Sequence, residues 1–303
     1  LVVMSDKKIS IAIPSANRIK ELKEVVFNIS KSGLNSIEEI LIVNDGYDQS
    51  TILEAFNRES EIPIRVVNNK YEKGFAWAFI TLIEEVKSEY FIFMTDDDIL
   101  NIDQIPCLFN HIQHSKSVII SPSWLGSNLY PLRSCSKDTV ISIQTLLKYT
   151  AHAPGLVFNT AACEGVIEQL KSIINEKIIF SLMYPQVILG GLLLKSSQEM
   201  TAIPLIIGED NHNIATGLTC DDGSAYFTFY SRLIQLASLD KLSRSNNSLF
   251  FNNSFFVNLK IQIMARMMLK SRFKIVISAT IIYLIRSFKV KMYTLIKNKS
   301  GDT

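Results

Sequence analysis

Three consecutive aspartates, Asp96, Asp97 and Asp98, directly follow an apolar run at residues 90–94. Adjacent carboxylates repel one another, so a bare cluster of this kind is electrostatically costly. A divalent cation removes that cost, and Mg²⁺ and Mn²⁺ prefer oxygen ligands while keeping coordination positions for substrate phosphates. The alternative is a solvated acidic loop that caps the next helix. The apolar run before the cluster favours a metal-bound diphosphate.

Two other polar segments could contact a nucleotide. Asp45, in Asn44-Asp45-Gly46, could accept hydrogen bonds from a base or a ribose, although an Asp-Gly pair is also common in simple turns. Arg18 could pair with a phosphate in a forked geometry. The alternative for Asn17 and Arg18 is a helix N-cap followed by an exposed basic residue.

The elements that must position these residues alternate along the first hundred residues. Short β-branched runs predict strands, and runs with apolar residues three and four apart predict helices. This alternation indicates an α/β fold, with a mostly parallel sheet and helices on both faces. The carboxyl ends of such strands share one edge, where ligands bind in open α/β sheets. The predicted strands are residues 9–13, 39–43, 63–67 and 90–94, and the predicted helices are 19–32, 49–57 and 74–86.

The second half is less regular. A segment rich in Ser and Asn at 240–253 suggests a linker. We therefore expect a catalytic domain over residues 1–235, followed by a linker and a basic amphipathic helical extension over residues 236–303. The predicted strands here are 118–120, 156–158 and 203–207, and the predicted helices are 167–174, 184–194, 227–236, 257–269 and 273–296.

Taken together, three segments resemble the opening of the family 2 glycosyltransferases. The resemblance covers about the first hundred residues. It implies the GT-A fold, a Rossmann-like arrangement with an N-terminal nucleotide-binding half and a DxD-type metal motif. The segments are Ile11-Ala12-Ile13-Pro14-Ser15-Ala16-Asn17-Arg18, Leu41-Ile42-Val43-Asn44-Asp45-Gly46 and Phe91-Ile92-Phe93-Met94-Thr95-Asp96-Asp97-Asp98.

The same resemblance implies roles for single residues. Pro14, Ser15 and Asp45 would line the nucleoside pocket, and Asn69 and Gly74 would lie near the base and ribose. The aspartates would hold Mn²⁺ or Mg²⁺ and the sugar diphosphate. The expected donor-binding set is Pro14, Ser15, Asn17, Arg18, Asp45, Asn69, Lys73, Gly74 and Asp96, with Asp96, Asp97 and Asp98 at the metal.

Two departures from the family pattern affect this set. The helix after the third strand lacks the Arg and Asn that the family often has there, and Lys73 is the residue that could compensate. Extended geometry would place Asp96 and Asp98 on the same side of the chain. Family members that read Thr-Asp-Asp would instead make Asp97 the direct metal ligand.

The catalytic base is harder to place. An inverting transfer needs a carboxylate that takes the proton from the acceptor hydroxyl. The family usually supplies it from a Glu-Asp pair at the start of a helix, but here that helix begins Tyr184-Pro185-Gln186, without an acid. Glu209-Asp210 could reach the site from a loop or simply form a turn. His152 could bind the acceptor or act as the base, and a structural histidine is the alternative.

The basic charge is concentrated at the end of the chain. From residue 259 onward there are ten Lys or Arg and one acid, so this part carries about +9 although the whole chain carries +2. Large apolar side chains lie between the basic ones, as in a helix that binds an anionic membrane surface. Nucleic acid also attracts basic tails, but it would leave these apolar residues without a role. A helical pair packed on the catalytic domain is the alternative.

These observations predict a metal-dependent glycosyltransferase that moves a sugar from a nucleotide-diphosphate sugar to a hydroxyl of a lipid-linked saccharide, as in synthesis of O-antigen or capsule. Two rival interpretations are a non-catalytic membrane-associated scaffold and a sugar-phosphate nucleotidyltransferase. The start of the chain does not resemble a signal peptide, and four scattered cysteines fit a reducing compartment. We therefore expect a cytoplasmic protein on the inner face of a bacterial cell membrane.

Overall fold

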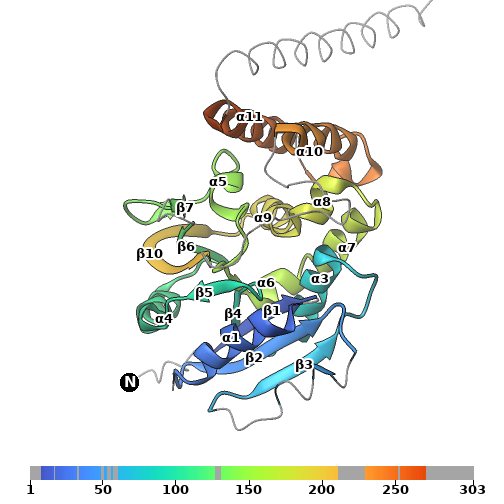
Figure 1. Cartoon of the computed structure of the whole chain (residues 1–303). Coiled ribbons are helices and arrows are strands. Elements are labelled where there is room, and N and C mark those ends of the chain that lie inside the picture. Colours follow the sequence, from blue (N-terminus) through green and yellow to red (C-terminus); the bar gives the residue numbers. More distant parts are fainter. Residues whose placement is uncertain are drawn as a thin grey trace, which may run out of the picture.

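Four parallel strands form the N-terminal half of the sheet (Figure 1). They are β1 (Ile9–Ser15), β2 (Ile37–Asn44), β3 (Ile64–Asn68) and β4 (Tyr90–Phe93), in the order β3-β2-β1-β4. Each is a short, mostly apolar run that ends near a polar turn, as expected for strands covered on both faces.

The structure is a computed structural model that describes residues 8–16, 18–32, 34–48, 51–52, 56, 61–126, 131–210, 229–251 and 253–270.

The C-terminal half makes the sheet mixed. The short β9 (Val157–Asn159) runs antiparallel between β4 and β6 (Ile119–Leu125), and β10 (Met200–Asp210) lies parallel to β6. The three-residue β5 (Asp98–Leu100) pairs antiparallel with the end of β10. Two small strands, β7 (Pro131–Arg133) and β8 (Thr139–Val140), pair with β6 and β10. The last residue of the aspartate cluster therefore begins a strand.

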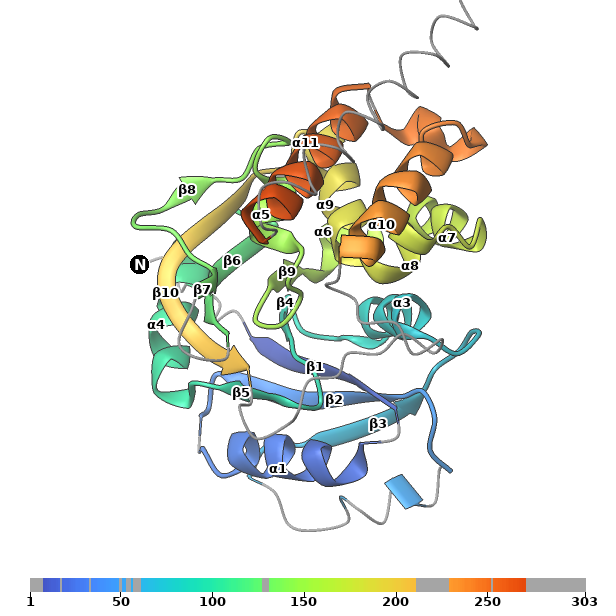
Figure 2. The ribbon, with the colours of Figure 1, turned by 45° about the horizontal axis from the view of Figure 1, so that its top comes forward.

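Helices cover both faces of the sheet (Figure 2). Successive side chains of β1 point to opposite faces of the sheet and so contribute to two apolar clusters, one on each face. Ile11 and Ile13 pack in the first cluster, and Ala12 packs in the second. The first cluster includes α1 (Ile19–Ser30) and α4 (Ile105–His114). The second includes α3 (Phe75–Glu85), α5 (Leu146–Thr150), α6 (Thr160–Glu164), α7 (Ile167–Asn175), α8 (Ile179–Met183) and α9 (Pro185–Lys195).

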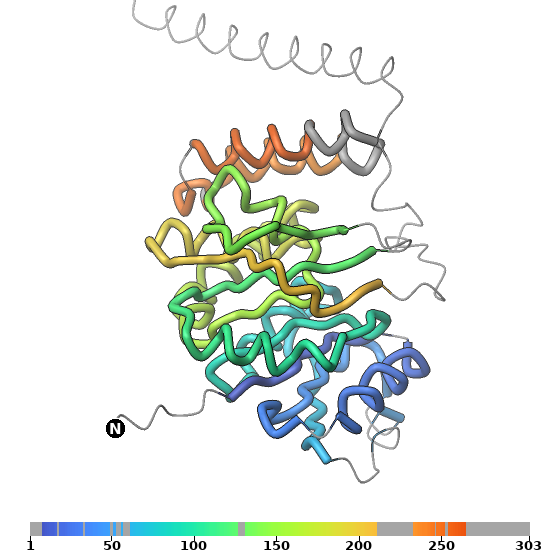
Figure 3. The backbone as a smooth tube through the Cα atoms, turned by 90° about the vertical axis from the view of Figure 1, so that its left-hand side faces the viewer, coloured from blue at the N-terminus to red at the C-terminus, as the bar shows by residue number. Residues whose placement is uncertain are grey.

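Two further helices continue the second layer. The helices α10 (Phe229–Leu242) and α11 (Asn253–Lys270) are joined through the short η3 (Asn246–Phe250). They lie side by side at the end of the molecule away from α1 and β3 (Figures 1 and 3). Phe255 packs closely over Gly191 of α9, where even a methyl group would meet its ring at 2.3 Å. The inner face of α11 is thus part of the core.

The predicted fold class is confirmed, and each strand and helix predicted within the described residues is present with ends shifted by a few residues. The expected boundary after residue 235 falls inside α10, and Leu236, Leu239 and Leu242 are buried in the same cluster as α3 and α9. The expected helix at 273–296 lies outside the described residues, as does most of the one at 49–57. None of the helices in the described part of the chain is long and apolar enough to cross a membrane.

Candidate active site

The ends of β1, β2 and β3 bring the expected nucleoside-pocket residues together. Backbone hydrogen bonds from Asp45 N to Ser15 O (2.9 Å) and from Asn69 N to Asn44 O (2.8 Å) align the turns that follow these strands. One carboxylate oxygen of Asp45 accepts from Asn69 Nδ2 at 2.6 Å, and the other accepts from Gly74 N at 2.8 Å. Asp45 therefore fixes the loop between β3 and α3.

Gly74 adopts a backbone conformation that requires glycine. Its φ is +131°, a value that residues with a Cβ atom rarely adopt, and it directly precedes the first turn of α3. Lys73 is exposed in the same loop, and Pro14 is half-buried in β1 beside β2. Asn17 lies outside the described residues.

The first two aspartates of the cluster face Ser15 and Arg18. Asp96 accepts a hydrogen bond from Ser15 Oγ at 2.7 Å, and Arg18 Nη1 lies 3.5 Å from its other oxygen. The same nitrogen of Arg18 contacts Asp97 Oδ2. Burial raises the pKa of Asp96 to about 6, and the neighbouring Asp97 charge adds to this effect. The segment that follows β1 thus carries both a hydroxyl and a cation into the acidic cluster.

Tyr47 also belongs to this side of the site, although no sequence pattern indicated it. Its hydroxyl contacts Ser15 Oγ (3.3 Å) and accepts from the backbone N–H of Arg18. Its own backbone is fixed by hydrogen bonds with the Asn44 side chain, at 2.9 and 3.0 Å. Burial is the main cause of its raised pKa. Tyr47 therefore ties the turn after β2 to the segment after β1.

The third aspartate faces the other half of the molecule. Asp98 accepts a hydrogen bond from the Thr95 hydroxyl and lies opposite Asp210 in the β5–β10 pairing. Burial raises its pKa well above the usual value, and the nearby charges of Asp97, Asp210 and Asp96 raise it further. Asp96 and Asp97 form a turn rather than an extended strand, so Asp96 faces β1 and Asp98 faces β10, and the predicted placement of both on one side of the chain is wrong. The two carboxylates remain close enough for the Asp96 charge to raise the pKa of Asp98.

Asp98, His152 and Asp210 form a group with metal-ligand spacing. One ligand atom from each residue lies within 4.8 Å of the others. The indole N–H of Trp124 donates to Asp210 Oδ1 at 3.1 Å, and His152 Nε2 lies 3.7 Å from the same oxygen. The structure therefore brings two of the three expected catalytic residues, Asp210 and His152, next to the aspartate cluster. In an extended strand Glu209 points away from the side that Asp210 faces.

Buried residues that the sequence analysis did not identify hold this group in place. Trp124 is fully buried against Gly155 and Gly208, where an added methyl group would meet its ring at 2.5 and 2.3 Å. The guanidinium of the buried Arg133 donates to the carbonyl oxygens of His152 (2.6 Å) and Pro154 (2.9 Å). Burial lowers the pKa of Arg133 to about 9. The His152 segment is therefore rigidly attached to the sheet.

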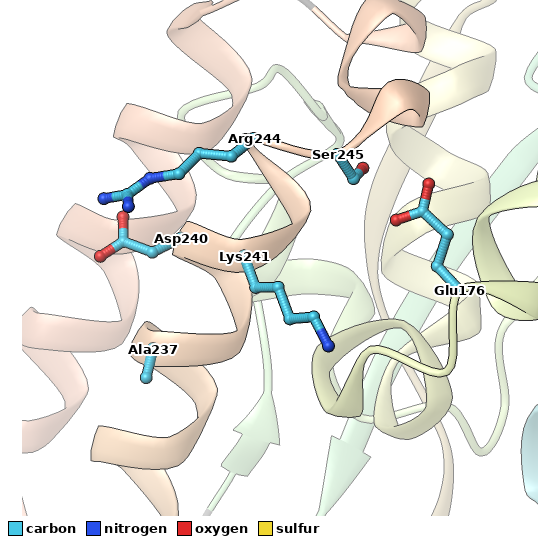
Figure 4. Close-up of a pocket in the computed structure, with 6 residues that line it drawn as sticks. All are labelled: Glu176, Ala237, Asp240, Lys241, Arg244 and Ser245. Carbon is cyan, nitrogen blue, oxygen red and sulfur yellow. The ribbon is translucent and has the colours of Figure 1, made fainter.

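The start of α9 supplies no acid, as the sequence indicated. Gln186 is buried there and donates to the carbonyl oxygen of Ala151 at 3.0 Å, directly before His152. A pocket of about 550 Å³ lies elsewhere, between the end of α7 and α10, and mixes both signs of charge (Figure 4). It is lined by Glu176, Ala237, Asp240, Lys241, Arg244 and Ser245, none of which belongs to the acidic cluster.

Comparison with known sequences matches residues 10–139 to the family described as "Glycosyl transferase family 2". A dolichol-phosphate mannosyltransferase from Pyrococcus furiosus is 28% identical over 120 residues, which cover 39% of this chain and 34% of that protein. The uncharacterized glycosyltransferase YwdF from Bacillus subtilis is 30% identical over 130 residues, which cover 41% of this chain and 47% of that protein. The chain thus spans less than half the length of these relatives.

Comparison with solved structures extends the likeness to most of the chain. S. aureus TarS 1–349 in complex with UDP-GlcNAc has a TM-score of 0.57 at 13% identity, covering 88% of this chain and 74% of that one. The mannosyltransferase PcManGT from Pyrobaculum calidifontis, in complex with GDP-Man and Mn²⁺, has a TM-score of 0.53 at 9% identity. The match covers 94% of this chain and 81% of that one. Residues 10–139 are therefore similar in sequence to the family 2 glycosyltransferases, and the described part of the chain has the GT-A fold.

Proposed function

We propose that this chain is a metal-dependent glycosyltransferase that moves a sugar from a nucleotide-diphosphate sugar to a hydroxyl group. One observation carries the proposal: four aspartates from both halves of the chain meet at the edge of the sheet, where Asp45 also fixes the loop between β3 and α3. Similar folds bind UDP-GlcNAc in TarS and GDP-Man in PcManGT. The loops around Asp45 would hold the nucleoside of such a donor, and the acidic cluster would hold its diphosphate through the metal.

The acidic cluster fits a divalent cation. The Arg18 guanidinium already places positive charge against Asp96 and Asp97, and burial with mutual repulsion raises the pKa of Asp98. Oxygen ligands of this kind suit Mn²⁺ or Mg²⁺. Asp96, Asp97 and Asp98 would hold the ion, which when bound would neutralise the charge on the departing diphosphate.

The opposite side of the cluster supplies the base. Asp210 is held by the Trp124 indole and lies beside Asp98 and His152, so a hydroxyl that approaches the donor from the β10 side would meet its carboxylate. We infer that Asp210 accepts the acceptor proton while the oxygen attacks the sugar carbon opposite the diphosphate. Attack from the opposite face inverts the configuration at that carbon.

Substitution of Asp210 tests this assignment. Asp210→Asn keeps the shape of the side chain but cannot accept the proton, so transfer should fall by roughly 10²–10⁴-fold. Calorimetric titration with UDP and GDP in the presence of Mn²⁺ should remain within about twofold of the unmodified chain. Glu209→Gln, on the neighbouring residue, is the matched control and should retain transfer.

The other outcomes are informative. Loss of Mn²⁺ binding in Asp210→Asn would show instead that the ion is held by Asp98, His152 and Asp210. Failure of the folded chain to bind UDP, GDP, CDP or dTDP with Mn²⁺ would exclude the donor site. That result would favour the non-catalytic scaffold. Formation of a nucleotide sugar and pyrophosphate from a sugar phosphate and a nucleoside triphosphate would favour the nucleotidyltransferase.

The C-terminal part of the chain suggests which class of acceptor the protein uses. The outer face of α11 exposes Val257 and Ile261, and the basic residues after 271 continue beyond it. Apolar side chains beside basic ones suit the surface of an anionic membrane. We propose a lipid-linked saccharide acceptor, a place on the inner face of a bacterial membrane, and a role in making surface polysaccharides.

A further inference from the structure

Arg18 occupies the acidic cluster that the proposed function assigns to a metal ion. Its Nη1 contacts Asp97 Oδ2 and lies 3.5 Å from Asp96 Oδ1. The two carboxylates are largely shielded from water, with 9% and 17% of their side chains exposed, whereas the Arg18 side chain is 38% exposed. Within the described residues, Arg18 is the only Lys or Arg that forms an ion pair with these aspartates.

The guanidinium and a divalent cation compete for the same two carboxylates. A metal ion binds carboxylate oxygens at about 2.0–2.6 Å, so its charge would lie close to the guanidinium and repel it. Arginine stays protonated in proteins, so it cannot leave by losing its charge. Repulsion between the two cations therefore favours movement of the Arg18 side chain away from Asp96 and Asp97 when a metal binds.

The surroundings allow the side chain to move while the backbone stays in place. The Arg18 N–H is held by the Tyr47 hydroxyl, which also contacts Ser15, so the start of α1 remains attached to the turn after β2. The guanidinium stands on a long side chain that is partly exposed on the edge where the donor would bind. A displaced guanidinium at this edge can form a forked pair with a phosphate.

We propose that Arg18 is an exchangeable internal counter-ion: it neutralises Asp96 and Asp97 when no metal ion is bound, and it pairs with the donor diphosphate when a metal ion takes its place. This inference rests on the proposed donor site. The exchange makes the metal and the donor bind cooperatively, because the diphosphate pairs with the Arg18 guanidinium that the metal displaces. Coupling between two ligands is reciprocal, so each tightens the binding of the other.

Titration of Mn²⁺ into the full chain tests the exchange without any activity assay. Arg18→Gln removes the competing charge, so Mn²⁺ alone should bind about fivefold more tightly, the lower end of the ~5–150-fold range of such couplings. Arg18→Lys should stay close to the unmodified chain. The matched control is Lys20→Gln, which removes an exposed charge two residues away in α1 and should leave Mn²⁺ binding unchanged. Circular dichroism confirms that each variant is folded.

The second arm repeats the titration with UDP and with GDP. The nucleotide should tighten Mn²⁺ binding in the unmodified chain and do so clearly less in Arg18→Gln. Unchanged or weaker Mn²⁺ binding in Arg18→Gln, or an equal nucleotide effect in both chains, would overturn the exchange and leave the donor site standing. If neither chain binds Mn²⁺, the proposed metal site fails together with the inference.

Discussion

At the scale of single residues, the acidic cluster places charge where water cannot stabilise it. Asp96 and Asp98 are buried carboxyl groups beside a third aspartate, and both have raised pKa values because of burial. Groups perturbed in this way are common at functional sites, where a ligand relieves the cost. Ionisation of these buried carboxyl groups should therefore lower the stability of the folded chain at neutral pH when no ligand is bound.

Asp96→Asn measures this cost. A pKa raised from 3.8 to about 6 means that the folded state binds the proton more tightly than the unfolded state. The resulting stability is fully present below pH 3.8 and is lost as the pH rises through 6, about 3 kcal/mol in all. Asn cannot ionise, so the variant should lose this pH-dependent part of its unfolding free energy, measured by urea unfolding between pH 4 and 7.

The exposed Asp138→Asn serves as the control and should unfold with the pH dependence of the unmodified chain. A pH dependence in Asp96→Asn equal to that of the unmodified chain would contradict the effect of burial on Asp96. Added Mn²⁺ should raise the stability of the unmodified chain at pH 7 more than that of Asp96→Asn, because only the former offers the full set of carboxylates.

At the scale of elements, the short pairing of β5 with β10 decides whether the two sides of the site meet. It places Asp98 opposite Asp210, and Gly208 lies opposite Leu100 in the same register. A methyl group on Gly208 would lie 2.3 Å from the Trp124 ring and 2.6 Å from the backbone oxygen of Ile99. The glycine allows the strand, the indole and β5 to approach one another this closely.

Gly208→Ala should therefore disturb both the packing and the site. Overpacking of a tight core costs about 1–3 kcal/mol, so the melting temperature should fall by several degrees. Displacement of β5 should also weaken Mn²⁺ binding, as measured by calorimetry. Gly165→Ala is the control, because its nearest neighbour would lie at an ordinary 3.4 Å. Equal melting temperatures for the two variants would contradict the close packing around Gly208.

The elements of the donor side could be predicted from the sequence, whereas the opposite side could be predicted only in part. The apolar runs of β1 to β4 and the polar residues after them are local patterns, and they indicated Asp45, Asn69 and the aspartates. The meeting of Asp98 with Asp210 depends on a pairing between segments far apart in the chain. Tyr47 and Trp124 contribute hydrogen bonds to residues far away in the chain, and no local sequence pattern reveals such contacts.

At the scale of the whole molecule, α10 and α11 are continuous with the core. Phe255, Leu259 and Ile263 are buried, and Lys260 pairs with Asp240 of α10. The amphipathic pattern of α11 is therefore explained partly by packing, which was the alternative to membrane contact. Val257 and Ile261 remain 54% and 52% exposed on the other face.

Vesicle binding tests a role for that outer face. The full chain should co-sediment with vesicles that contain phosphatidylglycerol, and less with pure phosphatidylcholine, because basic residues favour anionic lipid. Val257→Asp combined with Ile261→Asp should weaken this binding by at least roughly tenfold, because the exposed halves of the two side chains together contribute about 1.5–3 kcal/mol when they enter the membrane. Val140→Asp, at an exposed apolar residue of β8, should bind like the unmodified chain. Equal binding to both kinds of vesicle would exclude an electrostatic contribution.

The buried position of Trp124 also gives the protein an optical reporter of its own. The chain has two tryptophans, and the indole of Trp124 contacts the Asp210 carboxylate and lies 5.6 Å from the His152 ring. Indole emission responds to charges and protons this close to the ring. With Trp77 replaced by Phe, the fluorescence of one chromophore would follow events at Asp210 directly, so occupation of the site could be timed in a stopped-flow instrument without any label.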